Sequence, residues 1–198
     1  MTKLLQAFHE FDTYNQKDSY EFKWNDISYP QEYFLGQRLY EWVLKLNPNV
    51  NELLLLASRC QHIGRWEIPR ESYPDGRDAY LKWRKDLALF HAEKASSILK
   101  SVGYTDEQVE RVNQIILKKK LKADPDVQTM ENALCLVFLE FQYEDFYPKH
   151  TPEKVVNILK KSLLKMDSHG HSFALNLKFS EKGMYYVVEA LNCIKQTL

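Results

Sequence analysis

The sequence LLLLASRCQHIGRW at positions 53 to 66 joins an apolar run to a histidine and then to a glycine. The apolar run predicts a helix over 50–62, and a second helix is predicted over 76–102. Between them, positions 64–75 contain two prolines and form the longest irregular segment of the core region. Irregular segments held between helices often carry functional side chains. We therefore expect a functional site between Gln61 and His91.

Helical periodicity extends over almost the whole chain, and the predicted helix ends carry suitable capping residues. Asn49 with Glu52, and Thr105 with Gln108, have the spacing of a capping box. Gly103 is placed to end the helix 76–102. The other helices are predicted over 2–16, 31–46, 106–120, 126–146, 152–166 and 181–196, with Pro125 and Pro152 each following a cap residue.

This pattern predicts an all-α fold, a helical bundle of about seven or eight helices. The 198 residues are enough for one well-buried domain, and 44% hydrophobic content excludes a disordered chain. We expect a single domain over 1–198, in which the C-terminal helix at 181–198 packs on the core.

Charge and cysteine content restrict the function classes. Lys plus Arg and Asp plus Glu are equal at 27 each, which argues against a broad basic surface for nucleic acid or membranes. Three widely spaced cysteines favour reduced core residues, with no zinc-binding spacing. No apolar run is long enough to span a bilayer. We expect a soluble, cytoplasmic protein with no membrane partner.

Arginines gather around the predicted site although the chain is neutral. Five of the seven arginines lie between positions 59 and 84, which predicts a compact anionic ligand. At about 100° per residue, the helix 76–102 places Arg77, Tyr80, Arg84 and His91 on the arc that also holds its apolar residues. The polar side chains are therefore predicted to face inward. A buried ion-pair network that only holds the helices together is the alternative.

Glu140 is the lone charge in an otherwise apolar run of the helix 126–146. We expect it to pair with Arg84 or to bind a metal with His62 and His91, unless it extends to solvent between two helices. The lysine run at 118–122 is typical of a solvated helix end, although Lys120 and Lys122 could lie at the mouth of an arginine-lined pocket. His169-Gly170-His171 is predicted to lie in a loop and is a weak metal signal.

The order of these elements resembles the HD superfamily of metal-dependent phosphohydrolases. Their helical core carries a first histidine, a His-Asp pair at the end of an apolar helix, and a later aspartate. Here Gln37 stands at the first position, Gln61 and His62 at the pair, and Glu140 near the last. The resemblance implies an HD-like bundle and a divalent metal at His62, His91 and Glu140, with an altered ligand set.

A closer resemblance covers most of residues 30 to 170. It is to an HD-like family described as a domain of unknown function (DUF4202). The residues that carry it are Gln61-His62-Ile63, Arg65-Trp66, Ile68-Pro69-Arg70, Tyr73-Pro74, Gly76-Arg77, Trp83-Arg84, His91-Ala92-Glu93, Gln128 and the run from Leu136 to Glu140.

The leading functional hypothesis is a phosphohydrolase-like protein that acts on or binds a small phosphorylated metabolite or nucleotide. His62 and His91 would hold a divalent metal with Glu140, or act directly as general acid and base. Trp66 or Tyr73 could stack on a base. The residues predicted to bind the ligand are Arg65, Arg70, Tyr73, Arg77, Tyr80, Arg84, Lys120 and Lys122.

The sequence is also compatible with two other functions. A non-catalytic module that binds a nucleotide or another anion would keep the pocket and lose the metal, as the glutamines at positions 37 and 61 would suggest. An RNA-binding protein would use the same arginines with aromatic stacking, although the neutral charge counts against it.

Overall fold

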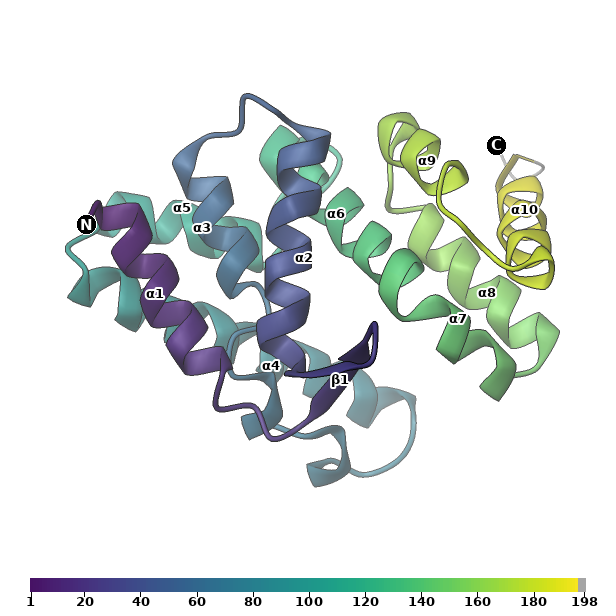
Figure 1. The fold of residues 1–198 in the computed structure, drawn as a ribbon, viewed down its shortest axis with the longest axis horizontal. Coiled ribbons are helices and arrows are strands. Elements are labelled where there is room, and N and C mark those ends of the chain that lie inside the picture. Colours follow the sequence, from purple (N-terminus) through teal and green to yellow (C-terminus); the bar gives the residue numbers. More distant parts are fainter. Residues whose placement is uncertain (196–198) are drawn as a thin grey trace. The chain divides into compact units, whose positions relative to one another are not determined.

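The computed structural model describes residues 1–195, which fall into two compact units (Figure 1). The first holds Met1–Leu44 and Pro48–Lys119, and the second holds Lys45–Asn47 and the chain from Lys120 onward. The described part is mainly helical, as predicted, but it contains ten α-helices and one small hairpin rather than seven or eight helices. None of the described helices is both long enough and apolar enough to cross a membrane.

The first unit is built from five helices that surround one apolar core. Helix α4 packs on α5, α5 on α3, and α1 on both α3 and α4. Leu54, Ile63, Leu99 and Ile115 are fully buried at the centre. Burying each such side chain contributes roughly 1.5–3 kcal/mol. The helices are α1 (Lys3–Asn15), α2 (Gln31–Leu46, of which the part to Leu44 belongs here), α3 (Glu52–Cys60), α4 (Arg77–Ser101) and α5 (Asp106–Ile116).

The helix ends confirm most of the predicted caps. The Thr105 side chain accepts from the backbone of Gln108, whose own side chain completes the capping box. Gly103 follows α4 with φ at 91°, a conformation that glycine adopts without steric cost. The predicted cap of the third helix is wrong by two residues. Asn51, rather than Asn49, caps α3 by accepting from the backbone N–H of Leu54 at 2.9 Å.

A β-hairpin that the helical pattern did not predict joins α1 to α2. Strands β1 (Glu21–Trp24) and β2 (Ile27–Pro30) pair antiparallel across a two-residue turn at Asn25 and Asp26, both with positive φ. The Phe22 ring stacks on Phe34 of α2 with centroids 4.8 Å apart. The hairpin is thereby fixed to the start of α2, which carries one of the site residues described below.

The loop between α3 and α4 is held in place by three kinds of contact. Gly64 starts it with φ at 69° in a space closed by Tyr14 and Phe90. The Trp83 indole N–H donates to the Ile68 carbonyl at 2.9 Å. The Arg70 guanidinium donates to the Tyr73 and Pro74 carbonyls. The loop contains two short 3-10 helices, η1 (Arg65–Glu67) and η2 (Arg70–Ser72).

In the second unit, α6 packs on α7 and α9, and α8 packs on α10. The helices are α6 (Pro125–Phe141), α7 (Tyr143–Phe146), α8 (Pro152–Leu163), α9 (Ser168–Leu175) and α10 (Glu181–Lys195), with the 3-10 helix η3 (Tyr147–Lys149) after α7. The segment His169-Gly170-His171 was predicted as a loop, and that prediction is wrong. It forms the first turn of α9, because Asp167 caps the helix by accepting from Gly170 N–H at 2.9 Å.

Candidate functional site

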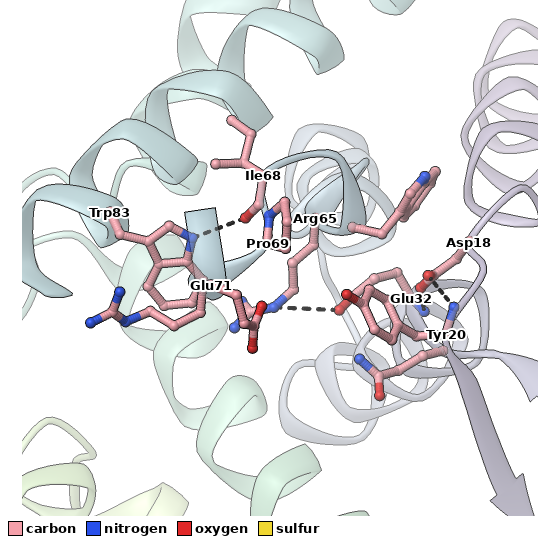
Figure 2. A pocket seen from close by; sticks show the side chains of 11 residues that line it. Asp18, Tyr20, Glu32, Arg65, Ile68, Pro69, Glu71 and Trp83 are labelled. Atoms are coloured by element: carbon pink, nitrogen blue, oxygen red, sulfur yellow. Dashed lines mark hydrogen bonds and ion pairs between the residues drawn. The ribbon is translucent and has the colours of Figure 1, made fainter. Parts of the chain in front are cut away.

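Two cavities of the first unit meet at Arg65, whose side chain lines both. We call the first the imidazole cavity. It has a volume of about 110 Å³ and is lined by Gln61, His62, Arg65, Arg84, Leu87, Ala88, His91, Ile116, Leu117 and Lys118. We call the second the tryptophan cavity (Figure 2). It has a volume of about 180 Å³ and is lined by Asp18, Tyr20, Gln31, Glu32, Arg65, Trp66, Ile68, Pro69, Arg70, Glu71 and Trp83.

His91 presents an unpartnered nitrogen in the wall of the imidazole cavity. The side chain is 2% exposed, and its Nδ1 lies 2.7 Å from the Ile63 carbonyl oxygen. A carbonyl oxygen only accepts, so Nδ1 carries the proton and Nε2 carries a lone pair. That buried Nε2 has no hydrogen-bond partner within the described residues. Burial, together with the charges of Arg65 and Arg84, lowers the pKa of His91 to about 4, so the ring is neutral near pH 7.

Gln61 adds a second buried acceptor to the same wall. Its side-chain amide donates to the Ile116 carbonyl at 3.0 Å, and the side chain is 4% exposed. The amide oxygen Oε1 is buried and makes no hydrogen bond in the described structure. A buried acceptor without a partner costs roughly 1–3 kcal/mol. Two such acceptors in one small cavity are therefore a reason to expect a bound group that donates to them.

The same cavity is lined by three cationic side chains and by no carboxylate. Arg84 is exposed on α4, and its Nη1 donates to the Tyr80 hydroxyl at 3.2 Å. Lys118 follows α5 in the left-handed conformation, with φ at 55°. Burial lowers the pKa of His62 well below its ordinary value, and neighbouring Arg65 lowers it further. The imidazole cavity thus combines neutral acceptors with a positive potential, which suits an anion that also carries a hydroxyl group or binds with a water molecule.

Glu32 is a site residue that the sequence analysis missed. It lies in the first turn of α2 and is 3% exposed. Its Oε1 is 3.6 Å from Arg65 Nε, and its Oε2 is 3.9 Å from His62 Nδ1. Burial raises the pKa of Glu32 to about 7, because Arg65 offsets only part of the desolvation and Asp18 opposes ionisation. Acidic residues are common in first helical turns, so the sequence signal at this position did not distinguish a buried site residue.

Only some of the predicted ligand-binding residues of the loop and of α4 line a cavity. Arg65 and Arg84 line the imidazole cavity. Arg70 lines the tryptophan cavity, but its terminal nitrogens donate to the Tyr73 and Pro74 carbonyls, each at 2.9 Å. The Tyr73 hydroxyl donates to Asp86 at 2.9 Å. The two bonds of Arg70 stabilise the loop, and that of Tyr73 ties the loop to α4.

The prediction that one polar arc of α4 faces inward is wrong for three of its four residues. Arg77, Tyr80 and Arg84 are exposed, and only His91 is buried. Arg77 and Tyr80 line neither cavity. For Arg77 and Tyr80 the cause is position along the helix, because the buried part of α4 begins only at Trp83.

Three further predicted residues belong to the second unit. Glu140 is half-buried on α6 rather than fully buried, Lys120 is exposed, and Lys122 donates to the Met166 carbonyl at 2.6 Å. Among the residues from 1 to 195, no group of three or more His, Cys, Asp or Glu side chains is placed to hold a metal ion.

Gln37, which the HD comparison placed at the first metal-binding histidine, takes part in a structural network. Its side-chain amide donates to Asp12 of α1 at 3.1 Å. Asp12 also pairs with Arg59, whose Cζ lies 4.9 Å from the ring centroid of Phe8 and 5.3 Å from that of Tyr40. This network connects α1, α2 and α3.

The sequence profile of the family described as "Domain of unknown function (DUF4202)" matches residues 5–187. The chain belongs to this family. The search of curated proteins and the search of solved structures gave no match.

Proposed function

We propose that this member of the family binds a small phosphorylated metabolite and holds its phosphate group in the imidazole cavity. The observation that carries the proposal is the pair of unpartnered buried acceptors, His91 Nε2 and Gln61 Oε1, beside three cationic side chains. A protonated phosphate oxygen, or a water bound between phosphate and protein, would supply the missing donors. Arg65, Arg84 and Lys118 would bind the charged oxygens.

The size of the cavity supports a phosphate group rather than a whole nucleotide at this point. A volume of about 110 Å³ corresponds to roughly three or four waters, each with a share of about 30 Å³ in the liquid. A phosphate group has five heavy atoms and is compact, so most of it would fit inside. The remainder of the metabolite would extend outside this cavity.

Hydrolysis of the phosphorylated ligand is a second candidate function, favoured by the lone pair on His91. A water that donates to Nε2 could transfer a proton to it during attack on phosphorus, which is general base catalysis. A phosphate dianion beside the ring would raise the pKa of His91 from its low value in the empty protein and would make the ring a better base. In this role the protein would be a phosphohydrolase, as the resemblance to the HD superfamily implies.

Phosphate binding in the imidazole cavity needs no metal ion. The resemblance implies a divalent ion at His62, His91 and Glu140, but Arg65, Arg84 and Lys118 line the same cavity as the two imidazoles and would repel such an ion. The donor set of the imidazole cavity therefore does not fit a divalent metal. Direct binding of the anion by side chains is the simpler account.

Titration calorimetry with orthophosphate in the presence of EDTA tests the proposal. We expect Arg84→Gln and Lys118→Gln each to weaken orthophosphate binding by about tenfold, the scale of one hydrogen bond to a charged group. His91→Asn keeps a donor for the Ile63 carbonyl and removes the free lone pair, and it should also weaken binding. Arg77→Gln is the matched control, because Arg77 is exposed on the same helix and lines neither cavity.

Three outcomes would contradict the proposal. Equal losses in Arg84→Gln and in the Arg77→Gln control would show that only overall charge matters. Binding that appears only after a divalent ion is added would favour the metal-dependent route. Binding of RNA that disappears with added salt, without any binding of orthophosphate, would favour the nucleic-acid alternative.

A further inference from the structure

The tryptophan cavity shares one lining residue with the proposed phosphate site. Arg65 lines both cavities, and Glu32 of the tryptophan cavity has its Oε2 3.9 Å from Nδ1 of His62 in the imidazole cavity. A cavity of about 150 Å³ is enough to bind one benzene ring. The tryptophan cavity has a volume of about 180 Å³. It could therefore hold one aromatic ring of a ligand whose phosphate binds in the imidazole cavity.

The walls of this cavity suit a flat group. Figure 2 shows Trp83 on one side and Tyr20 with Glu32 on the other, with Pro69 between them. Trp83 is 6% exposed, and its hydrogen bond to the Ile68 carbonyl at 2.9 Å fixes the indole. A rigid aromatic wall favours a planar ring because little side-chain freedom is lost on binding.

Several polar groups of the cavity already have partners within the protein. Both Asp18 oxygens already accept from backbone N–H groups, those of Tyr20 and Glu32, each at 2.9 Å. Both terminal nitrogens of Arg70 already donate to loop carbonyls. The carboxyl groups of Glu32 and Glu71 also line the cavity, together with Arg65 and with Gln31, whose side chain hydrogen-bonds to Glu32. Such an edge recognises N–H donors better than carbonyl acceptors.

We infer that the tryptophan cavity binds the other end of the phosphorylated ligand and selects a planar nitrogen heterocycle that carries an amino group. This inference rests on the proposed phosphate site and adds the class of ligand. The phosphate would lie among the cations of one cavity, and the amino edge of the ring would donate to the carboxylates of the other.

Nucleotide pairs that exchange an amino group for a carbonyl test the inference by titration calorimetry. AMP is compared with IMP, and CMP with UMP; in each pair the adjacent ring nitrogen also changes from an acceptor to an N–H donor, so the comparison reports recognition of the amino group itself. We expect the amino member of each pair to bind at least about tenfold more tightly, as one hydrogen bond to a carboxylate would give. Orthophosphate and ribose 5-phosphate are measured alongside.

Glu71→Gln should reduce the AMP preference over IMP severalfold and leave orthophosphate affinity unchanged. Glu71 is exposed, so this variant is expected to fold normally. Asp75→Asn is the control, because Asp75 is an exposed acid of the same loop that lines neither cavity. An unchanged preference in Glu71→Gln would count against the role of its carboxylate.

The results distinguish a failure of base selection from a failure of phosphate binding. Equal affinities within each pair, with orthophosphate still bound, would overturn the inference and leave the phosphate site standing. Failure of orthophosphate and of every phosphorylated probe to bind would overturn the phosphate proposal, and the inference with it.

Discussion

Glu32 imposes a cost on the folded state that a single substitution should reveal. The side chain is 3% exposed, and burial raises its pKa to about 7 although Arg65 lies nearby. Glutamine has nearly the shape of a protonated glutamate but cannot ionise. Glu32→Gln therefore removes the cost of burying an ionisable carboxyl group and preserves its volume.

The size and sign of the effect follow from proton linkage. The folded state holds the Glu32 proton more tightly than the unfolded chain, in which the pKa is near the ordinary 4.5. The contribution of Glu32 to stability is therefore fully present below pH 4.5 and is lost as the pH rises to 7. At 1.36 kcal/mol for each pH unit of difference, the loss reaches about 3 kcal/mol at pH 7 and about 1 kcal/mol at pH 5.

Urea unfolding of the wild-type protein and Glu32→Gln at pH 5, 6, 7 and 8 measures this difference. We expect the variant to be more stable by about 1 kcal/mol at pH 5 and by about 3 kcal/mol at pH 7 and 8. His62 and His91 titrate in both proteins, so their direct contributions largely cancel in the comparison. Glu93→Gln, an exposed position on α4, is the control. A difference that stays constant with pH, or a less stable variant at pH 8, would refute the reasoning.

Two further predictions concern the imidazole cavity and the loop that leads to it. Sulfate should bind more tightly as the pH falls from 7 to 5, because the bound anion raises the pKa of His91 from about 4 and binding then takes up a proton. Calorimetry of wild type and His91→Asn checks this, and the same pH dependence in both would contradict it. Gly64→Ala should destabilise by about 3 kcal/mol and Gly103→Ala by about 1 kcal/mol. Both glycines have positive φ, but only at Gly64 would the new Cβ meet a neighbour, Phe90 at 2.9 Å. Equal losses of unfolding free energy in urea for the two variants would argue against this close packing.

The sequence predicts helices best where a long periodic segment ends in a strong cap. The Thr105 capping box of α5 is an example, since both partners are local in sequence. The hairpin at Glu21–Pro30 was missed because its strands have four residues each and depend on Phe34, which lies beyond them in the sequence. Helix α9 was missed for a similar reason, because eight residues are too few to show a clear period.

The candidate site shows the same division between local and distant information. His62, Arg65, Arg84 and His91 are close in sequence around one loop, and the structure brings them to one cavity. Glu32 comes from α2, which begins at Gln31, well before this loop in the chain, and its burial against Arg65 depends on how α2 packs. No local pattern marks that contact.

The helical wheel of α4 failed for a different physical reason. Angular position on a helix shows which residues share a face, but it does not show how far the covered part of that face extends. Arg77 and Tyr80 precede Trp83, the first buried residue of α4, so they remain in solvent. Arg84 lines the cavity although it is exposed. A helical wheel assigns each residue to an inward or an outward face and so does not predict such a position.

The distribution of exposure explains how the empty site remains compatible with a stable fold. Arg84 is exposed and stays hydrated without a ligand, so its charge costs little in the empty protein. The groups at the inner positions are the neutral acceptors of His91 and Gln61 and the carboxyl group of Glu32, which can take up a proton. A ligand or a water that donates hydrogen bonds there would satisfy these acceptors. We accordingly expect Glu32→Gln to raise stability, and Arg84→Gln to weaken binding without that gain.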